Sequence, residues 1–552
     1  MSDFNTQILD SLVGTPLQPR AMFGGYEGAD RQDRTLALWQ PATLTADQSV
    51  LPDKITAEAR VQDLFRNDAY LAGAGSFYRD SVVGSYFRLN LEPHWKLLGL
   101  SETWAEEFAE EVEERWAVYA ESEECHADAS RRSTFTGMVR LAVLSYLQHQ
   151  EILTSVEWLR DRSRVSRTAF LQIDPDRLAN PMGKDDIFNN DRIRGGIKRR
   201  RNGEHLSYFI HDDNPLGALL NGNWGVREIP ARKPWGRRQI IYISEVGRID
   251  QTRGISQVTS AIRETKLGRR FRDIMIQNAL AKGTYAATLE SALPTEFLMN
   301  ALGKTAIVDP AAKVMDYMVG HGEAMQAFTR DAKRLSIDGV RIPHLPPGTK
   351  LNIQNAGGPG GLGDAFEGSV LRYTAAGLGM TYEEFTRDLR DTNYSSIKAG
   401  MAMTSRTMRA FQAMIASRYA SQMLQCWMEE EINNGRFTTM PSNAPNIYEG
   451  YNLQYYCEST WHATGLGQVD ELKETQAALL RISRGLSTYE KEISRLHGAD
   501  WKQVFAQVAK ERETLDRLGI VWEESNMLNA ATGNVGEPTT ETGDNTTKGA
   551  RT

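Results

Sequence analysis

A long helical repeat of apolar side chains occupies residues 398–436 and constrains the fold more than any other feature of the sequence. Its members recur at spacings of three and four residues, which place them on one face of an α-helix: Met408, Phe411, Ile415, Tyr419, Met423 and Trp427. Gly435 predicts where this helix stops, because glycine readily adopts the left-handed conformation found after many helix ends. The chain must therefore bury one face of a helix that extends to Asn434.

Other regions also carry helical patterns. In residues 101–120, Trp104, Phe108, Val112 and Trp116 recur every four residues, which predicts an amphipathic helix with a buried aromatic stripe and solvated glutamates. Residues 255–285 predict a long helix with Ser256 as a candidate N-cap. It carries six basic residues: Arg263, Lys266, Arg269, Arg270, Arg272 and Lys282. Residues 364–380 and, in shorter pieces, 468–520 are expected to be helical as well.

Between about residues 165 and 245 the spacing between apolar residues shortens to about two positions, which is the periodicity of a β-strand. The short runs AFLQID, HLSYFI and RQIIYIS are separated by DPDR, RRRNG and DDNPLG, which are turn signals. This pattern predicts an antiparallel sheet that follows a helical half. The expected fold class is therefore α+β and predominantly helical.

Three regions lack such regularity. Residues 1–60 have weak periodicity and are expected to form a partly ordered arm. Residues 286–362 resemble an insertion with loops of its own, with one short strand expected at KLNIQ. Residues 521–552 are rich in threonine, glycine and asparagine and are expected to be disordered.

Length and composition narrow the class of protein. At 552 residues the chain exceeds one ordinary core, so several domains or one large modular subunit are expected. The formal net charge of −7 predicts that any DNA contact is local or transient, because proteins that only grip nucleic acid are usually basic. Cys125, Cys426 and Cys457 are too few and too scattered for a disulfide framework or a zinc site. No signal peptide or membrane-spanning run is visible, which predicts a soluble protein from a reducing cytoplasm, without membrane contact.

The motifs argue against an enzyme. ALGKT at residues 301–305 contains a GK[ST] core, but Leu298 stands where a phosphate-binding loop needs glycine. The run GGPGGLG at 357–363 has a central proline that removes an N–H donor, so a turning loop is the preferred interpretation. No nucleophile elbow or HExxH pair is present. We therefore expect no catalytic residue and no cofactor.

Histidines next to aspartates raise the question of a metal site. His205 and His211 would share a face of one strand, and Asp212 and Asp213 follow them directly. The span between the histidines is apolar and DDNP is a turn, so surface histidines beside a turn-forming pair are preferred. The Cys-His pair at 125–126 has no second cysteine nearby. We expect no metal.

The strongest basic run consists of Lys198, Arg199, Arg200 and Arg201. Such a run could contact phosphates. A β-hairpin turn that continues into Asn202 and Gly203 explains its placement equally well, so both interpretations stay open.

The order of the segments is more informative than any one motif. The informative stretches are LGLSETWAEEFAEEVEERWAVYA, FLQIDPDRLANP, GIKRRRNGEHLSYFIHDDNP, RGISQVTSAI, IPHLPPGTKLNI, AAGLGMTYEEFTRD, DTNYSSIKAG and DELKETQAALLRISRGLSTYEKEISRLHGADWKQVF. Together they resemble the lambda-type portal protein family of tailed bacteriophages over roughly residues 60–520. Two positions depart from the family: VDELKE lacks the usual proline, and Lys198 replaces an acidic residue.

The resemblance implies a ring of about twelve subunits at one capsid vertex. Such a ring is the channel for DNA packaging and ejection, and it is part of the virion after assembly in the host cytoplasm. The implied partners are other copies of the chain, the terminase large subunit, head–tail connector or adaptor proteins, the major capsid protein and scaffold, and, transiently, double-stranded DNA. The implied domains are an arm (1–60), wing (61–254), first stem helix (255–285), clip (286–362), second stem helix (363–381), tunnel loop (382–397), long wing helix (398–436), crown (437–520) and tail (521–552).

The resemblance places the polar stretch DTNYSSIKAGM, residues 391–401, at the inner rim of the channel. The implied tunnel residues are Arg387, Asp388, Arg390, Asp391, Asn393, Tyr394, Ser395 and Ser396. Alternating charges there would nearly cancel, and the polar groups would make exchangeable contacts with passing DNA. Ser395 or Ser396 is also a candidate cap for the helix that follows.

Two other classes of protein remain alternatives. One is a phage enzyme, such as a terminase subunit or a head protease, which the absent motifs disfavour. The other is a capsid or tail scaffold that assembles into open chains. The basic residues of 255–285 could face the channel or pair with acidic groups of a neighbouring subunit, and pairing between subunits is preferred.

Overall fold

In the computed structural model, the described residues are 35–36, 38–181, 192–212, 225–284, 335–337, 340–342, 362–390, 392–463, 471–498 and 501–520. Several expectations therefore lie outside the described residues: the arm up to residue 34, the KLNIQ strand with most of the segment 286–362, Asp391 and the tail 521–552. The GK[ST] sequence and nearly all of GGPGGLG lie outside as well.

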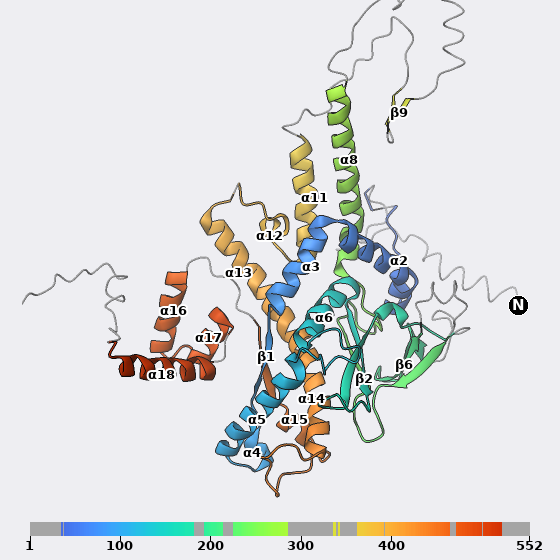
Figure 1. The fold of residues 1–552 in the computed structure, drawn as a ribbon. Coiled ribbons are helices and arrows are strands. Elements are labelled where there is room, and N and C mark those ends of the chain that lie inside the picture. Colours follow the sequence, from blue (N-terminus) through green and yellow to red (C-terminus); the bar gives the residue numbers. More distant parts are fainter. Residues whose placement is uncertain are drawn as a thin grey trace, which may run out of the picture.

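Helices packed on antiparallel sheets make up the main body (Figure 1). The described part opens with α2 (Ala46–Asn67), α3 (Ala69–Val82), α4 (Trp95–Leu98), α5 (Glu102–Glu121) and α6 (Phe135–His149). The predicted amphipathic helix is confirmed as α5, since all four residues of its aromatic stripe are buried. Ser101 caps α5 by accepting from the backbone N–H of Trp104, and Thr134 caps α6 in the same manner.

Residues 46–60 belong to α2 rather than to an arm, which corrects the expectation for this part of the chain. A capping box starts the helix: the Thr45 hydroxyl accepts from the backbone of Gln48, and the Gln48 side chain accepts from the backbone of Thr45. Asp47, Lys54 and Glu58 lie on its buried face. The sequence showed weak periodicity because these buried positions are charged rather than apolar.

Two antiparallel sheets form the second layer, with strand orders β3–β2–β8 and β4–β5–β6–β7. Their strands are β2 (Glu151–Trp158), β3 (Thr168–Ile173), β4 (Ile193–Arg194), β5 (Ile197–Arg199), β6 (His205–His211), β7 (Val226–Pro230) and β8 (Ile240–Ser244). In the first sheet Leu153 of β2 lies opposite Ile173 and Tyr242. The three predicted strands are confirmed as β3, β6 and β8, and a short 3₁₀ helix, η2 (Pro175–Arg177), follows β3. An α+β, mostly helical fold is thereby confirmed.

The long helix of residues 398–436 is confirmed, with an irregular centre. It consists of α13 (Tyr394–Phe411), a π-helical turn, η4 (Gln412–Ser417), and α14 (Arg418–Asn433). Gly435 has φ 62° and ends it as predicted. The N–H of Gly435 donates to the carbonyl of Ile432, and that of Arg436 to the carbonyl of Glu431, which is a Schellman motif. The apolar periodicity did not reveal the π turn.

Strand pairing joins two segments far apart in the sequence in one core. β1 (Phe87–Leu91) pairs with β11 (Ser459–Ala463), and the rings of Phe87 and Trp461 stack with centroids 5.4 Å apart. The short helix α15 (Asn452–Tyr456) packs on α4 and α14. Residues 437–463 therefore belong to the main body, although the crown was expected to begin at residue 437. The three cysteines are buried and free.

Two antiparallel helices project from the body (Figure 1). A 3₁₀ turn, η3 (Gln257–Ala261), leads into α8 (Ile262–Thr284), and α11 (Leu362–Leu378) returns alongside. Ser256 caps η3 as predicted. The hydroxyls of Thr265 and Thr374 are 3.2 Å apart, and the rings of Phe271 and Phe366 have centroids 4.8 Å apart, which fixes the antiparallel register.

The C-terminal helices lie to one side of the body (Figure 1). They are α16 (Glu471–Ser483), α17 (Tyr489–His497) and α18 (Trp501–Leu518), which confirms the shorter helical pieces predicted for 468–520. Tyr86 contacts this block by donating to the carbonyl of His497 at 2.7 Å. A two-stranded hairpin of β9 (Leu335–Ile337) and β10 (Val340–Ile342) was not predicted. Among the described helices none combines the length and apolar character needed to cross a membrane.

Candidate functional site

The loop between α12 (Tyr382–Thr386) and α13 is the segment expected to face DNA. Thr381 and Glu384 form a capping box at the start of α12, and Arg387 ends it in a left-handed conformation with φ 57°. Asn393 caps α13 by accepting from the backbone N–H of Ser396 at 2.8 Å. The expectation that Ser395 or Ser396 is the cap is therefore wrong, because both already lie in the first turn of the helix, where their side chains are exposed.

Two of the three charged residues that the structure describes within this loop, Asp388 and Arg390, neutralise each other. The Asp388 carboxylate accepts from Arg390 Nε at 2.9 Å and Nη2 at 2.6 Å, and also from the backbone N–H of Arg390. These hydrogen bonds lower the pKa of Asp388 to about 2. Arg387 is exposed and forms no ion pair within the described residues. The predicted charge balance holds for Asp388 and Arg390, while Arg387 is an exposed cation without a carboxylate partner among the described residues.

The exposed face of α13 is basic, which the sequence reasoning missed. Lys398, Arg406 and Arg409 are exposed there and have no carboxylate partner within the described chain. Half-exposed Tyr394 lies under the Lys398 ammonium, which is 5.7 Å from the ring centroid. A signal was available, because no aspartate or glutamate occurs from residue 392 to residue 428. A solvent-facing helix without acidic residues is an attractive surface for phosphates.

The helices α12 and α13 on either side of the loop are packed against each other and against the body. A Cβ added at Gly400 would approach Thr381 Cγ2 to 3.0 Å, so α13 crosses the start of α12 at close range. The Thr404 hydroxyl donates to Glu384, and Tyr78 packs edge-on against Phe411 with ring centroids 5.6 Å apart. The polar surface therefore rests on a packed platform rather than on a freely moving segment.

The basic run ends β5 and turns into β6, as the hairpin interpretation predicted. Three of its cations have carboxylate partners in their own chain, at N–O distances of 3.4, 3.2 and 2.9 Å: Lys198 with Glu228, Arg199 with Asp47, and Arg200 with Glu204. Arg201 is exposed. This pairing favours the turn over a phosphate site, and phosphate contact by the run stays an untested prediction.

The histidines considered from sequence each have a local partner. His211 Nε2 lies 3.1 Å from the carbonyl oxygen of Ala179, and His205 Nδ1 lies 3.2 Å from the hydroxyl of Tyr208. Asp212 pairs with Arg227 at 3.2 Å, and Asp213 lies outside the described residues. The structure thus gives these side chains separate structural roles.

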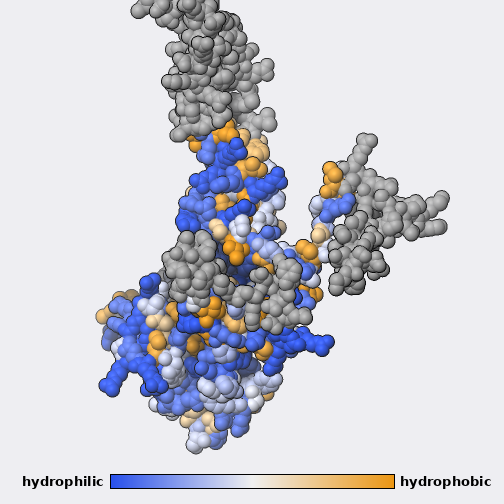
Figure 2. Space-filling view, turned by 90° about the vertical axis from the view of Figure 1, so that its right-hand side faces the viewer, coloured by the Kyte–Doolittle hydropathy of each residue, from blue (hydrophilic) through white to orange (hydrophobic). Residues whose placement is uncertain are grey.

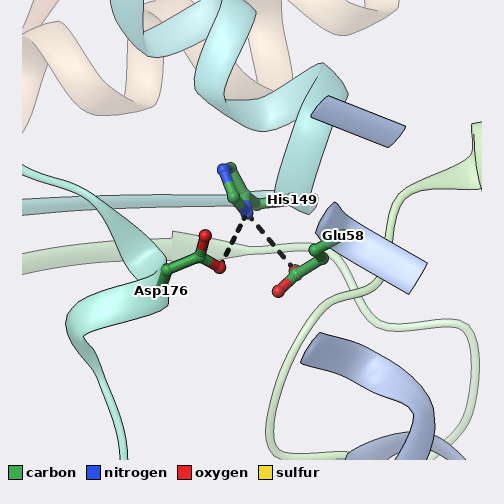
Figure 3. Close-up of side chains that lie close together, drawn as sticks. All are labelled: Glu58, His149 and Asp176. Atoms are coloured by element: carbon green, nitrogen blue, oxygen red, sulfur yellow. Dashed lines mark ion pairs between the residues drawn. The ribbon is translucent and has the colours of Figure 1, made fainter. Parts of the chain in front are cut away.

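A different histidine, His149, lies close to two carboxylates. Nothing in the sequence indicated this cluster. Glu58 of α2, His149 at the end of α6 and Asp176 of η2 offer atoms that all lie within 4.8 Å of one another. Figure 3 shows the two carboxylates turned towards the imidazole, with His149 Nδ1 3.4 Å from Glu58 and 3.8 Å from Asp176. The imidazole is 3% exposed. One nitrogen and two oxygen atoms are ligand types suited to a transition metal.

The surrounding groups favour a proton over a metal ion at this place. The Lys54 ammonium donates to Glu58, the same carboxylate that faces His149, and lies 3.4 Å from Glu151. Gln62 donates to Asp176 at 2.8 Å. A divalent cation would lie beside a buried ammonium, and the two would repel each other. A protonated His149 instead carries a positive charge close to both carboxylates, and Lys54 can stay in its place.

The protonation of His149 predicts a pH-dependent stability. Burial alone would lower the pKa of His149, but the hydrogen bond and charge of Glu58, followed by Asp176 and Asp174, raise it above its usual value. The stabilisation is complete below the unfolded-state pKa of about 6.5 and is lost as pH rises through the folded-state pKa. The free-energy advantage of the native chain over His149→Gln should therefore shrink as pH increases. Urea denaturation at a series of pH values measures it, and a difference that is independent of pH would contradict the assignment.

A buried ionic network extends from this cluster to the base of the projecting helices. Glu151 accepts from Arg253 Nε at 2.7 Å and Nη2 at 2.6 Å, and from the backbone N–H of Gly254 at 2.7 Å. Lys54 donates to the Gly254 carbonyl at 2.7 Å. Burial alone would raise the pKa of Glu151, but Arg253 and then Lys54 lower it to about 2. The network ties α2 and β2 to the residues that lead into α8.

Comparisons with known proteins agree on one family. The family described as "Phage portal protein, lambda family" matches residues 32–412. The portal protein of Escherichia phage N15 is 35% identical over 514 residues, which are 92% of this chain and 93% of that protein. Portal protein B of Escherichia phage lambda is 34% identical over 496 residues, 90% of this chain and 89% of that protein. A solved chain from the neck of an empty gene transfer agent particle aligns with TM-score 0.41 and 10% identity, over 80% of this chain and 98% of that one, a likeness too weak to carry an argument.

Proposed function

The chain belongs to the lambda family of phage portal proteins, and from this premise we propose that it assembles into a closed ring of about twelve copies at one capsid vertex. In this proposal the ring is the channel through which double-stranded DNA is packaged and later ejected. It docks the terminase large subunit first and head–tail connector proteins afterwards, and it contacts the major capsid protein and scaffold. Its role is structural and involves no catalysis.

The observation that carries the proposal is the projecting pair of helices α8 and α11. Large apolar side chains remain exposed along both helices: Leu267, Ile274, Ile276, Phe366 and Tyr373 are each more than two-fifths exposed. Figure 2 shows hydrophobic patches on this projection among hydrophilic ones. Apolar surface of this kind is typical of protein contacts. Neighbouring copies in a ring would cover it, which supports assembly through these helices.

The helices and loops of the chain suggest how the ring is divided. We assign α8 and α11 to the stem, the segment 286–362 to the clip, the body up to Ala463 to the wing, and α16–α18 to the crown. The packing of residues 437–463 into the body is the reason for moving the start of the crown.

The loop before α13 and the exposed face of α13 fit a channel wall. Each copy carries a net charge of −7, so a ring as a whole would repel DNA. Arg387, Lys398 and Arg406 would provide local attraction, while the closed Asp388–Arg390 pair limits it. Shallow, exposed contacts of this kind would exchange as DNA slides, because salt ions compete with phosphates at exposed cations.

Native mass spectrometry and cryo-EM of the purified protein test the proposal. A closed ring of about twelve copies is the expected result. An open-ended distribution of sizes would favour a scaffold that assembles into chains. ATP hydrolysis by the purified protein alone would favour an enzyme instead.

Replacing Arg387 and Arg390 together with alanine is expected to leave the ring intact and weaken its contact with DNA. If each arginine contacts one phosphate, the slope of log K against log salt for duplex binding should fall by about 1 to 2. Electrophoretic mobility shifts of isolated rings over a salt series measure that slope. Arg160→Ala with Arg162→Ala makes the same change of charge in the exposed loop after β2 and should leave the slope unchanged. Loss of the ring in the loop variant would show that these arginines are structural.

A further inference from the structure

A cavity of about 270 Å³ lies between the loop joining β7 to β8 and the helices α14 and α15. We name it the arginine pocket. Its most distinctive lining residues are Arg232, Arg237, Arg238, Trp235, Tyr448 and Tyr451. The aromatic side chains at its rim are well exposed, at 56% for Trp235, 48% for Tyr448 and 66% for Tyr451.

The arginine pocket has more positive charge than its own chain neutralises. Arg237 is paired with Glu429 at 3.0 Å. Arg232 donates to the carbonyl of Gly236, and Arg238 has no carboxylate partner within the described residues. Burial, followed by the neighbouring charge of Arg232, lowers the pKa of Arg238. A half-buried guanidinium beside another cation is favourable only when an anion joins them.

The lining of the arginine pocket favours a protein over DNA as the source of that anion. Arginine, tryptophan and tyrosine are the residue types that dominate binding energy at protein interfaces. The cavity admits a side chain but not a duplex, whose phosphates bind to open basic surfaces. Glu429, which lines the cavity, and exposed Glu449 nearby would repel a polyanion while tolerating a single carboxylate.

The same chain displays a matching anionic surface on α5, the acidic face. Its exposed glutamates have no basic partner within the described residues: Glu102, Glu106, Glu107, Glu110 and Glu114. Four of them follow each other at intervals of four residues, which brings like charges together and destabilises a helix. A cationic partner outside the subunit would remove that repulsion.

We propose that the acidic face of one copy docks into the arginine pocket of the next copy. The contact is heterologous, since it joins two different surfaces, and a ring closes only through contacts of this kind. Figure 1 shows α5 on one side of α14 and the strands β2 and β6 on the other, so one subunit can offer both surfaces at once. The inference rests on the proposed ring and names one contact that closes it.

Charge reversal on each side separates pairing from general damage. The pocket variant is Arg232→Glu with Arg238→Glu, the face variant is Glu106→Lys with Glu110→Lys, and the control is Glu123→Lys with Glu124→Lys just beyond α5. If the pocket variant is unfolded by circular dichroism, Arg232→Glu alone replaces it, because that side chain is exposed. Native mass spectrometry compares each variant with the native chain and with an equimolar mixture of the pocket and face variants.

Each reversed variant should raise the protein concentration needed for assembly by roughly 100-fold or more, because like charges then meet in the interface. The control should assemble normally. The mixture should recover assembly, since every contact then joins opposite charges. Variants that assemble normally alone, or a mixture that fails to recover, would overturn the pairing.

The same measurements separate this inference from the proposed ring. If the native chain forms no ring but the two variants associate with each other more strongly than with themselves, the contact stands and the ring is wrong. If the native ring persists in every variant, the ring stands and the contact is wrong. A pocket variant that assembles normally but loses binding of a short DNA duplex would identify DNA as the occupant and overturn the inference.

Discussion

Replacing Glu151 by glutamine is expected to lower the free energy of unfolding by about 3–5 kcal/mol, the usual cost of breaking a buried ion pair. Glu151 is fully buried, and its carboxylate serves the Arg253 guanidinium, the Tyr242 hydroxyl and the backbone N–H of Gly254. An amide has one oxygen and no charge, so it leaves Arg253 and Lys54 without their shared counter-ion. The cost arises because neither cation can reach water without unfolding the base of α8.

Denaturation by urea, followed by tryptophan fluorescence, measures this change. Glu124→Gln is the matched control, because Glu124 is also paired with an arginine, Arg131 at 3.5 Å, but the Glu124 side chain is 70% exposed. A much smaller change is expected there, since water screens exposed pairs. The double variant Glu151→Gln with Arg253→Met should be less destabilised than Glu151→Gln alone. Equal effects of Glu151→Gln and Glu124→Gln would refute the view that this network secures the junction.

Periodicity predicted those elements whose buried faces are apolar. The stripe from Trp104 to Trp116 gave α5, and the repeat from Met408 to Trp427 gave the long helix with its stop at Gly435. In both helices the free energy of burial comes from aliphatic and aromatic side chains, and these residues are directly visible as a periodic pattern in the sequence. α2 was missed because its buried face includes charged residues such as Lys54, which pairs with Glu58 in the same helix and with the distant Glu151.

In the candidate site, too, the sequence predicted features that depend on local residues and missed those that depend on tertiary packing. The family resemblance is the reason for choosing the loop around Arg387 and Asp388 as the candidate site, and this choice stays a prediction; the local sequence indicated a charge-balanced hinge there. The cap was misplaced by two positions or more, because asparagine at 393 and serine at 395 or 396 are all good caps and only the backbone decides among them. The sequence could not single out His149 or Arg238, since tertiary packing brings the carboxylates to His149 and buries Arg238.

Three consecutive glutamates at the end of α14 show how far burial can depart from composition. Glu429, Glu430 and Glu431 are each at most 3% exposed, although charged residues at a helix end usually face solvent. Each has a defined partner: Glu429 binds Arg237, Glu431 binds the Ser166 hydroxyl, and Glu430 accepts from strand β3 and the residue before it. The helix α14 therefore packs on the sheet through hydrogen bonds and an ion pair accepted by its glutamates, in addition to apolar contacts.

Replacing Glu430 by alanine is expected to destabilise the protein by about 2–3 kcal/mol, because it removes the acceptor of one buried and one partly buried backbone N–H. Glu430 accepts from the N–H of Arg167 at 2.8 Å and from that of Thr168 at 2.7 Å, where the sequence enters β3. Thr168 is fully buried, so water cannot replace the lost acceptor. Relief of repulsion with Glu429 and Glu431 offsets part of the cost, which keeps the expected value below that for Glu151.

Hydrogen exchange distinguishes this mechanism from general loosening of the fold. In Glu430→Ala the amides of Arg167 and Thr168 should exchange faster than the lower global stability alone explains. Amides at the centre of β2 should speed up only as much as the lower global stability explains. Glu430→Gln retains one acceptor and should show about half the destabilisation, because one of two hydrogen bonds remains possible. Glu449→Ala, an exposed glutamate after the same helix, should leave both stability and exchange unchanged. Uniformly faster exchange in Glu430→Ala, with no excess at Arg167 and Thr168, would mean that Glu430 stabilises α14 itself rather than its contact with the sheet.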